Sequence, residues 1–223
     1  FHLSEFDRRT LLQIAGLATG VGLLTSLAET RASAALPAAK LPGFSAFAKS
    51  VKVFKSDKYF LVESDGIPAH QLMVGIKSWQ QQVPTVQPYS GTNAWSIPIT
   101  PVISNAPMSA KDHFLRGAIA IAVNGIPIFN ALNNRGDDAL LAGELDNWGG
   151  HCGRADDYHY HVAPTHLQSV VGTKVPIAYA LDGFPIYGEK EPDGKKVVVL
   201  MHLMGISIQR KITTITQQRA IHI

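Results

Sequence analysis

The chain has 223 residues, of which 46% are hydrophobic and 17% are charged, a composition typical of a globular protein with one sizeable core or two small domains. Its net charge of +3 arises near the C-terminal end, where residues 200–223 carry Arg210, Lys211 and Arg219 and no acidic residue. Because the rest of the chain is balanced, the charge gives no indication of nucleic-acid binding. The single cysteine, Cys152, excludes an intrachain disulfide.

The N-terminal segment resembles an export signal. Residues 7–13, Asp-Arg-Arg-Thr-Leu-Leu-Gln, resemble a twin-arginine motif, and an apolar run follows over residues 14–27. Ala32-Ser33-Ala34 then gives the small-x-small pattern of a signal peptidase site. The run is short for a spanning helix, so we expect cleavage after Ala34 and no stable membrane span afterwards. We predict a signal peptide over residues 1–34, recognition by the twin-arginine translocase and signal peptidase, and a periplasmic or secreted bacterial protein.

The mature chain reads mainly as β-strands. Residues 35–50 are rich in Ala, Pro and Lys, and we expect them to be loosely ordered. Apolar and polar residues alternate over Val51–Lys55 and Tyr59–Ser64, which predicts strands, and residues 71–79 and 94–103 are further candidate strands.

Further along, residues 118–123 are apolar throughout and suit a buried strand. Residues 139–145 are a candidate short helix with Asp137 or Asp138 as its cap. No long segment has a convincing helical period. We therefore predict a mainly β, two-sheet, sandwich-like fold over residues 51–199.

A short phrase recurs along the chain. Residues 124–129, Asn-Gly-Ile-Pro-Ile-Phe, return as residues 182–187, Asp-Gly-Phe-Pro-Ile-Tyr, and residues 65–68 carry a shorter copy. The two longer copies each follow an apolar strand, and Asn-Gly or Asp-Gly between strands predicts a tight hairpin turn. The chain is therefore a tandem duplication of a β-hairpin unit.

The second unit lacks the end of the first. The first unit ends in Tyr158-His159-Tyr160-His161, whereas the second ends in an Ile-, Thr- and Gln-rich tail. The possible codons of residues 211–216 can also be read one frame away, taking the third base of each codon with the first two bases of the next. In that frame they permit the sequence Asn-Tyr-His-Tyr-His-Ala. Our hypothesis is that a one-frame slip near residues 197–200 replaced the native C-terminus, which makes residues 200–223 an aberrant tail.

The Tyr-His-Tyr-His segment predicts a metal site. Alternate side chains of a strand share a face, so His159 and His161 point one way and Tyr158 and Tyr160 the other. His151, a short loop away, can converge with them on one ion. Neutral imidazoles suit copper or zinc, and Cys152 is a weaker fourth ligand whose thiolate favours Cu(I) or Zn. We take His151, His159, His161 and Cys152 as candidate ligands.

Two other functions stay open. A metal-free hydrolase would pair His159 or His161 with an aspartate in acid–base catalysis. A glycan- or protein-binding β module would use exposed tryptophans for stacking. The aspartates are Asp146, Asp156 and Asp157, and the tryptophans are Trp79, Trp95 and Trp148. We expect His70, His113 and His166 to be surface or loop histidines.

These motifs resemble a known family. The Tyr-His-Tyr-His segment, with Gly150-His151 ahead of it and residues 182–188 behind it, resembles the bacterial YHYH domain family over roughly residues 51–199. The resemblance implies an exported bacterial protein and a fold, but no reaction. Members of that family usually carry the motif near the C-terminus too, and this chain lacks that copy.

Overall fold

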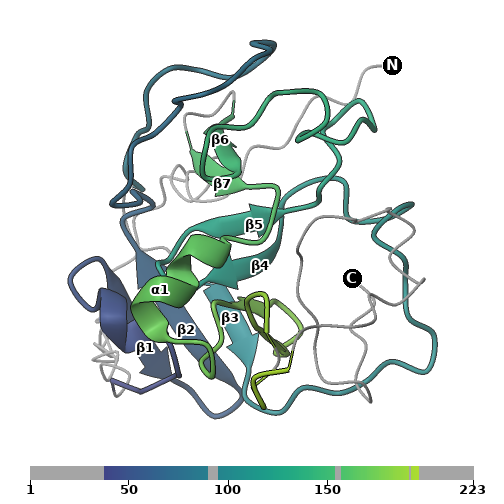
Figure 1. Ribbon diagram of the computed structural model, residues 1–223. Coiled ribbons are helices and arrows are strands. Elements are labelled where there is room, and N and C mark those ends of the chain that lie inside the picture. The colour runs from purple at the N-terminus through teal and green to yellow at the C-terminus, as the bar shows by residue number, and fades with distance from the viewer. Residues whose placement is uncertain (1–37, 90–94, 154–156, 191, 196–223) are drawn as a thin grey trace, which may run out of the picture. The chain divides into compact units, whose positions relative to one another are not determined.

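The structure is a computed structural model that describes residues 38–89, 95–153, 157–190 and 192–195. It is mainly β, with two sheets and a few short helical turns (Figure 1). The predicted signal peptide and the predicted aberrant tail lie outside the described residues. No helix within the described part has the length and apolar character needed to cross a bilayer.

The first sheet has three antiparallel strands in the order β1-β2-β3. The alternating patterns predicted β1 (Val51–Lys55) and β2 (Tyr59–Ser64) with their observed bounds, and Val53 pairs with Val62 at the centre of their ladder. β3 (Trp95–Pro98) is the only part of the predicted strand over residues 94–103 that forms a ladder.

The predicted strand over residues 71–79 is wrong, because this segment forms bends and loops. Met73 has a φ of 60°, which is the left-handed region and breaks an extended run. The backbone groups of this segment bond to a neighbouring loop instead: the amides of Lys77 and Ser78 both donate to the carbonyl of Gly143 at 2.9 Å. None of the described strands pairs with this segment.

The second sheet has six strands in the order β6-β7-β5-β4-β8-β9. The repeated phrase forms the two predicted hairpins, β4–β5 and β8–β9, and the two hairpins pair with each other through β4 and β8. β5 then pairs in parallel with β7, and β7 in antiparallel with β6. The bounds are β4 (Ala118–Ala122), β5 (Pro127–Phe129), β6 (Gly150–Cys152), β7 (Tyr158–Tyr160), β8 (Ala178–Ala180) and β9 (Pro185–Ile186).

One hydrophobic core joins the two sheets. Buried side chains from β1, β2 and β3 lie in the same cluster as those from β4, β7 and β8. The Asn-Gly turn contributes to this contact, since Gly125 has a φ of +82° and its carbonyl accepts a 2.7 Å hydrogen bond from the Ser64 hydroxyl. A side chain at position 125 would overlap Ser64 and Val51, so the turn glycine is needed both for its conformation and for this close approach.

Helical structure is limited to short turns: η2 (Phe44–Phe47), η3 (Thr165–Leu167) and α1 (Gln168–Val171). Residues 38–50 are more ordered than their composition predicted, because Phe44 is buried and the amide of Ala39 donates to Val53 on β1. The predicted helix over residues 139–145 is wrong: the segment makes turns only. Its predicted cap is nevertheless present, since the Asp138 carboxylate accepts the amides of Leu140 and Leu141.

Candidate metal centre

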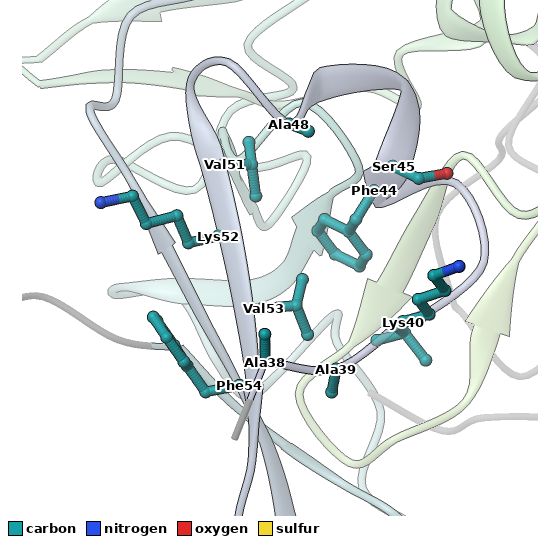
Figure 2. Close-up of a pocket in the computed structure, with 11 residues that line it drawn as sticks. Ala38, Ala39, Lys40, Phe44, Ser45, Ala48, Val51, Lys52, Val53 and Phe54 are labelled. Carbon is teal, nitrogen blue, oxygen red and sulfur yellow. The ribbon is translucent and has the colours of Figure 1, made fainter. Parts of the chain in front are cut away.

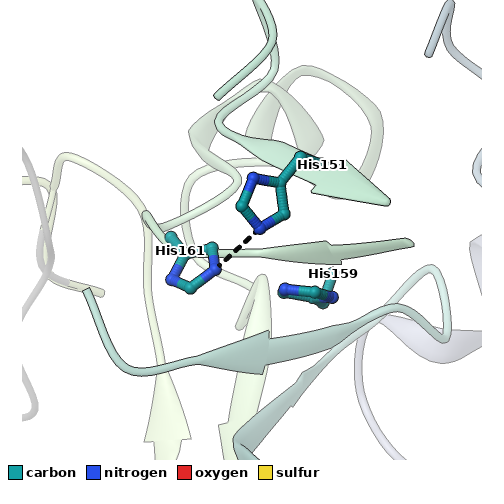
Figure 3. A group of neighbouring side chains, drawn as sticks. All are labelled: His151, His159 and His161. Atoms are coloured by element: carbon teal, nitrogen blue, oxygen red, sulfur yellow. Dashed lines mark hydrogen bonds between the residues drawn. The ribbon is translucent and has the colours of Figure 1, made fainter. Parts of the chain in front are cut away.

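Strands β6 and β7 bring three histidines onto one face of the second sheet. His151 of β6 lies directly opposite His159 of β7 in the antiparallel ladder, so the two side chains share a face. His161 is two residues beyond His159 and lies on that face as well. All three are buried, with 5–7% of each residue exposed. Figure 3 shows the three rings close together beside the two strands.

The rings form a compact triangle. Their centroids are 4.9 Å apart for His151 and His159, 4.8 Å for His151 and His161, and 5.0 Å for His159 and His161. One ligand nitrogen from each residue lies within 4.8 Å of the other two. The closest pair joins the Nε2 atoms of His151 and His161 at 3.2 Å.

Backbone carbonyls hold each ring by its Nδ1 atom. His151 Nδ1 lies 2.9 Å from the carbonyl oxygen of Glu144, and His161 Nδ1 lies 2.5 Å from that of Asn130. His159 Nδ1 lies 3.2 Å from the carbonyl oxygen of Asp157. A carbonyl oxygen can only accept, so each Nδ1 must carry the proton. The Nε2 atom of each neutral ring therefore presents a lone pair, which is the form that binds a metal.

Burial keeps these rings neutral. Burial, with the nearby His151 acting in the same direction, lowers the pKa of His161 to about 4. Burial also lowers the pKa of His159 well below its ordinary value, with the neighbouring imidazoles acting in the same direction. The pKa of His151 is lowered by burial, against a smaller opposite effect of the Glu144 carbonyl. Near neutral pH all three rings are free bases.

The protonation of the two rings determines the nature of the 3.2 Å contact between the Nε2 atoms of His151 and His161. It is a hydrogen bond only if one ring carries a second proton, and the lowered pKa values oppose that. With both rings neutral, two lone pairs face each other. Two nitrogens bound to one tetrahedral zinc ion at about 2.0–2.1 Å are roughly 3.3–3.4 Å apart. The observed spacing therefore fits a shared cation, and a ligand nitrogen of His159 lies within 4.8 Å of the other two.

Neighbouring residues fix where the strands meet. The Asp146 carboxylate accepts the amides of Trp148 and Gly150, which shapes the turn into β6, and it accepts the Tyr158 hydroxyl at 2.9 Å. Gly150 is required next to His151, because a Cβ there would lie 2.5 Å from the carbonyl oxygen of His159. The turn and the missing side chain let β6 and β7 approach closely enough for the histidines to converge.

Cys152 is not part of this cluster. It follows His151 on β6 and pairs with Tyr158, so its side chain points to the opposite face, where it lies in the hydrophobic core with Tyr158 and Tyr160. Its backbone amide donates to the sulfur of Met73 at 3.0 Å. The structure thus brings together three of the four predicted ligands.

Two supporting features were missed from the sequence. Phe129, at the end of β5, stacks on His159 with ring centroids 4.0 Å apart and an interplanar angle of 18°. The other is a histidine on the tyrosine face: His70 lies 2.8 Å from the Tyr160 hydroxyl and stacks on Trp148. The sequence did carry a signal for Phe129. Both copies of the repeated phrase end in an aromatic residue, Phe129 in one and Tyr187 in the other.

The structure does not assemble the hydrolase alternative from the residues it describes. Asp146 contacts the Tyr158 hydroxyl, and Asp157 meets His159 through its backbone carbonyl; Asp156 lies outside the described residues. The three tryptophans do not form one stacking surface either, since no ring contact in the described part of the chain joins two of them. Trp95 packs on the core, Trp148 stacks on His70, and Trp79 is 49% exposed.

A pocket of about 470 Å³ lies elsewhere, between residues 38–48 and β1 (Figure 2). Its walls are mainly apolar, with Phe44, Val51 and Val53 among them, and Lys40 and Lys52 supply its charges. It contains no histidine, cysteine or carboxylate, so it offers no metal ligand. The candidate site is therefore the histidine cluster and not this pocket.

Comparison with known proteins gives one match. The family model described as YHYH protein matches residues 94–202, a range that includes β3 to β9 and all three histidines of the cluster. Searches of curated proteins and of solved structures found no match.

Proposed function

We propose that this chain, which belongs to the YHYH family, is an exported bacterial protein that binds a transition metal ion. The ion is copper or zinc, and the ligands are His151, His159 and His161. The export step rests on the twin-arginine motif and the cleavage pattern that precede the β domain. The metal site rests on the contacts of the cluster itself.

One observation carries the proposal: the Nε2 atoms of His151 and His161 face each other at 3.2 Å in a buried site. A structural histidine normally uses both ring nitrogens in hydrogen bonds. Here each Nδ1 is fixed to a carbonyl, and among the described residues the two Nε2 atoms have only each other as hydrogen-bond partners. A cation between them removes the repulsion of the lone pairs and supplies the missing bond.

The ligand set favours Zn²⁺ or Cu²⁺ over Cu(I). Imidazole suits both divalent ions, whereas the thiolate that favours Cu(I) is absent from the cluster because Cys152 faces the core. Three histidines and one open position form a known kind of zinc set, in which the bound ion acidifies a water molecule or polarises a carbonyl group. The protein's own part is to keep the three imidazoles neutral, oriented and shielded from bulk water.

Elemental analysis tests the proposal. The protein is produced without a histidine tag, exchanged against excess Zn²⁺ or Cu²⁺, desalted and assayed for bound metal. We expect about one equivalent per chain, and its loss in the variant His159→Ala/His161→Ala. His113→Ala is the matched control, because His113 is exposed and lies outside the cluster; it should retain the full equivalent.

Two results would contradict the proposal. One is a full equivalent of metal in the double variant, which would place the ion elsewhere. The other is a folded parent protein that binds no metal at micromolar concentrations of Zn²⁺ and of Cu²⁺. Circular dichroism of each variant without metal separates loss of the site from loss of the fold.

A further inference from the structure

Asp146 places a buried carboxylate behind the histidine cluster. It is 5% exposed, and its Oδ1 atom accepts the amides of Trp148 at 2.9 Å and of Gly150 at 3.2 Å. Gly150 directly precedes His151 on β6, so the carboxylate bonds to the backbone next to a proposed ligand. The Tyr158 hydroxyl also donates to it at 2.9 Å, which places the carboxylate on the face of the sheet opposite the imidazoles.

The groups that bind this carboxylate are all uncharged. In addition to the two amides and the hydroxyl, the amide of Met73 donates to its Oδ2 atom at 3.1 Å. The ion pairs of the described residues are Arg135–Asp137, Arg135–Glu144 and Lys195–Asp193. None of them involves Asp146. A buried charge is costly unless an opposite charge compensates it, and the described side chains supply no such charge to Asp146.

Asp157 brings a second carboxylate close to the cluster. A Cβ atom at Gly153 would lie 3.0 Å from the Cε1 atom of His159 and 3.8 Å from the Oδ1 atom of Asp157. The carboxylate therefore lies near the edge of the ring whose Nε2 atom is a proposed metal ligand. Asp157 is half-buried, so water screens its charge more than it screens the charge of Asp146.

The field of these carboxylates reaches the cluster. Burial lowers the pKa of His151, and the Glu144 carbonyl opposes this effect. The negative charges of Glu144, Asp146 and Asp157 also oppose it, so each of them favours positive charge on this ring. A field that favours a proton at an imidazole favours a metal cation at the same place.

The balance of charge distinguishes a divalent ion from Cu(I). The three imidazoles are neutral, and Arg135 compensates the charge of Glu144 through their ion pair. Asp146 and Asp157 are then left as two negative charges beside the cluster. A divalent ion balances both charges, whereas Cu(I) balances only one. Because Coulomb attraction is proportional to the charge of the ion, the same carboxylates attract a divalent ion about twice as strongly as Cu(I).

We propose that Asp146, assisted by Asp157, is the counter-charge of the histidine cluster and makes the cluster selective for a divalent ion over Cu(I). Asp146 does not bind the ion: it acts through its field, in addition to shaping the turn into β6. This inference rests on the metal function proposed above and specifies the ionic charge that the same site prefers. It is independent of the missing thiolate, because it depends on charges outside the ligand set.

The test removes the charge of Asp146 and compares ions of different charge. Loss of a group that supports a ligand lowers metal affinity about 10–100-fold, and we expect Asp146→Asn to weaken Zn²⁺ and Cu²⁺ binding by that factor. For Cu(I) we expect about the square root of it, roughly 3–10-fold. The Cu(II)/Cu(I) potential should then rise by about 30–60 mV, since a tenfold change corresponds to about 59 mV. Chelator competition measures the affinities, and voltammetry of the copper-loaded protein measures the potential.

A matched control separates this effect from a general change of charge. Asp112→Asn is the same chemical change at an exposed position, and it should move neither the affinities nor the potential. A loss that came only from a disturbed turn would not depend on the charge of the ion. Equal losses of Zn²⁺ and Cu(I) affinity in Asp146→Asn, with an unchanged potential, would therefore overturn the proposal.

A second variant decides if circular dichroism shows that Asp146→Asn does not fold. Asp157→Asn changes a half-buried side chain, and we expect it to lower the ratio of Zn²⁺ to Cu(I) affinity by about twofold or more. An unchanged ratio would then overturn the proposal. A folded parent protein that binds neither Zn²⁺ nor Cu²⁺ overturns the metal site itself. A parent protein that binds one equivalent, with a ratio that the deciding variant leaves unchanged, overturns only the counter-charge.

Discussion

The two faces of strand β7 place buried polar groups side by side but use them differently. On the tyrosine face, the Tyr158 hydroxyl donates to Asp146, and Tyr160 joins His70 and Asn124. His70 is satisfied at both nitrogens, since its Nδ1 lies 2.8 Å from the carbonyl of Gln71 and its Nε2 lies 2.8 Å from the Tyr160 hydroxyl. His70, Tyr158 and Tyr160 thus belong to a hydrogen-bond network of the kind that stabilises a fold. His166 packs on Tyr160 at this face, and its buried Nε2 atom has no hydrogen-bond partner among the described residues.

On the histidine face, a backbone carbonyl accepts a hydrogen bond from the Nδ1 atom of each ring, and the Nε2 atoms have no such acceptor among the described residues. The Nε2 atoms of His151 and His161 face each other at 3.2 Å, and the fold bears the energetic cost of this arrangement in the absence of a cation. The comparison shows that burial of a histidine does not identify a ligand. What distinguishes His151 and His161 is that their Nε2 atoms face each other at 3.2 Å, whereas the His166 ring packs against Trp148 and Tyr160.

Removing one histidine from each face should give the largest difference. His161→Ala removes a proposed ligand. Loss of a group that only supports a ligand lowers metal affinity about 10–100-fold, so we expect this variant to bind the metal at least ~100-fold more weakly. His70→Ala removes a half-buried histidine on the other face, and we expect a change below about threefold in metal affinity. Competition titration with a chromogenic chelator measures both. Equal losses in the two variants would remove the distinction between the faces.

Acid should destabilise the metal-free protein through the histidine face. The pKa of His161 is about 4 in the folded protein and about 6.5 in the unfolded chain. Between these two pKa values the unfolded chain binds more protons than the folded protein. The contribution of His161 to the free energy of unfolding is therefore fully present above pH ~6.5 and is lost as the pH drops towards ~4, by roughly 3 kcal/mol. Denaturant unfolding with chelator present, at several pH values, measures the slope. His161→Ala should flatten the slope and His113→Ala should leave it; a parent protein without any slope would contradict the neutral-ring assignment.

A hydroxyl deletion on the tyrosine face should affect stability and leave metal binding unchanged. Tyr158→Phe removes the hydroxyl that donates to the Asp146 carboxylate, and a hydrogen bond to a charged group contributes about 1.5–3 kcal/mol. We expect the free energy of unfolding to fall by that amount, seen as a lower denaturant midpoint, and a full equivalent of bound metal. The prediction fails if the variant loses the metal while it remains folded.

The smallest expected effect is the loss of the aromatic cover on the histidine face. Phe129→Leu keeps the apolar character of the position but removes the ring that stacks on His159. Such ring contacts contribute about 0.5–1.5 kcal/mol, which corresponds to a roughly two- to tenfold weaker metal affinity. Tyr187→Leu, the equivalent change in the second hairpin, should leave the metal affinity of the histidine cluster unchanged in the same titration.

Local patterns were sufficient for part of the fold. Alternation predicted β1 and β2 with their observed bounds, and the repeated glycine turns predicted both hairpins. The same alternation placed His159 and His161 on one face. It also implies that Cys152 faces away from His151 once β6 is known to be a strand, but a three-residue strand is too short for its pattern to be recognised.

What the sequence could not predict depends on long-range contacts. The left-handed backbone of Met73 and the bonds from residues 77 and 78 to Gly143 exclude a strand over residues 71–79. His70 reaches Tyr160 across 90 positions of the chain, and no periodicity signals such a pair. The orientation of the three ligand rings was equally inaccessible, because it comes from backbone carbonyls, which every residue type carries.

That last feature bears on how the centre tolerates genetic change. The three groups that aim the imidazoles are peptide oxygens of Glu144, Asp157 and Asn130, and replacing those side chains leaves the oxygens in place wherever the loop keeps its path. Substitutions at exposed positions of the supporting loops should therefore leave the imidazoles in place. Asn130 and Glu144 are less tolerant because their side chains are buried and hydrogen-bonded, and insertion or deletion of a single residue in these loops would misalign a ligand.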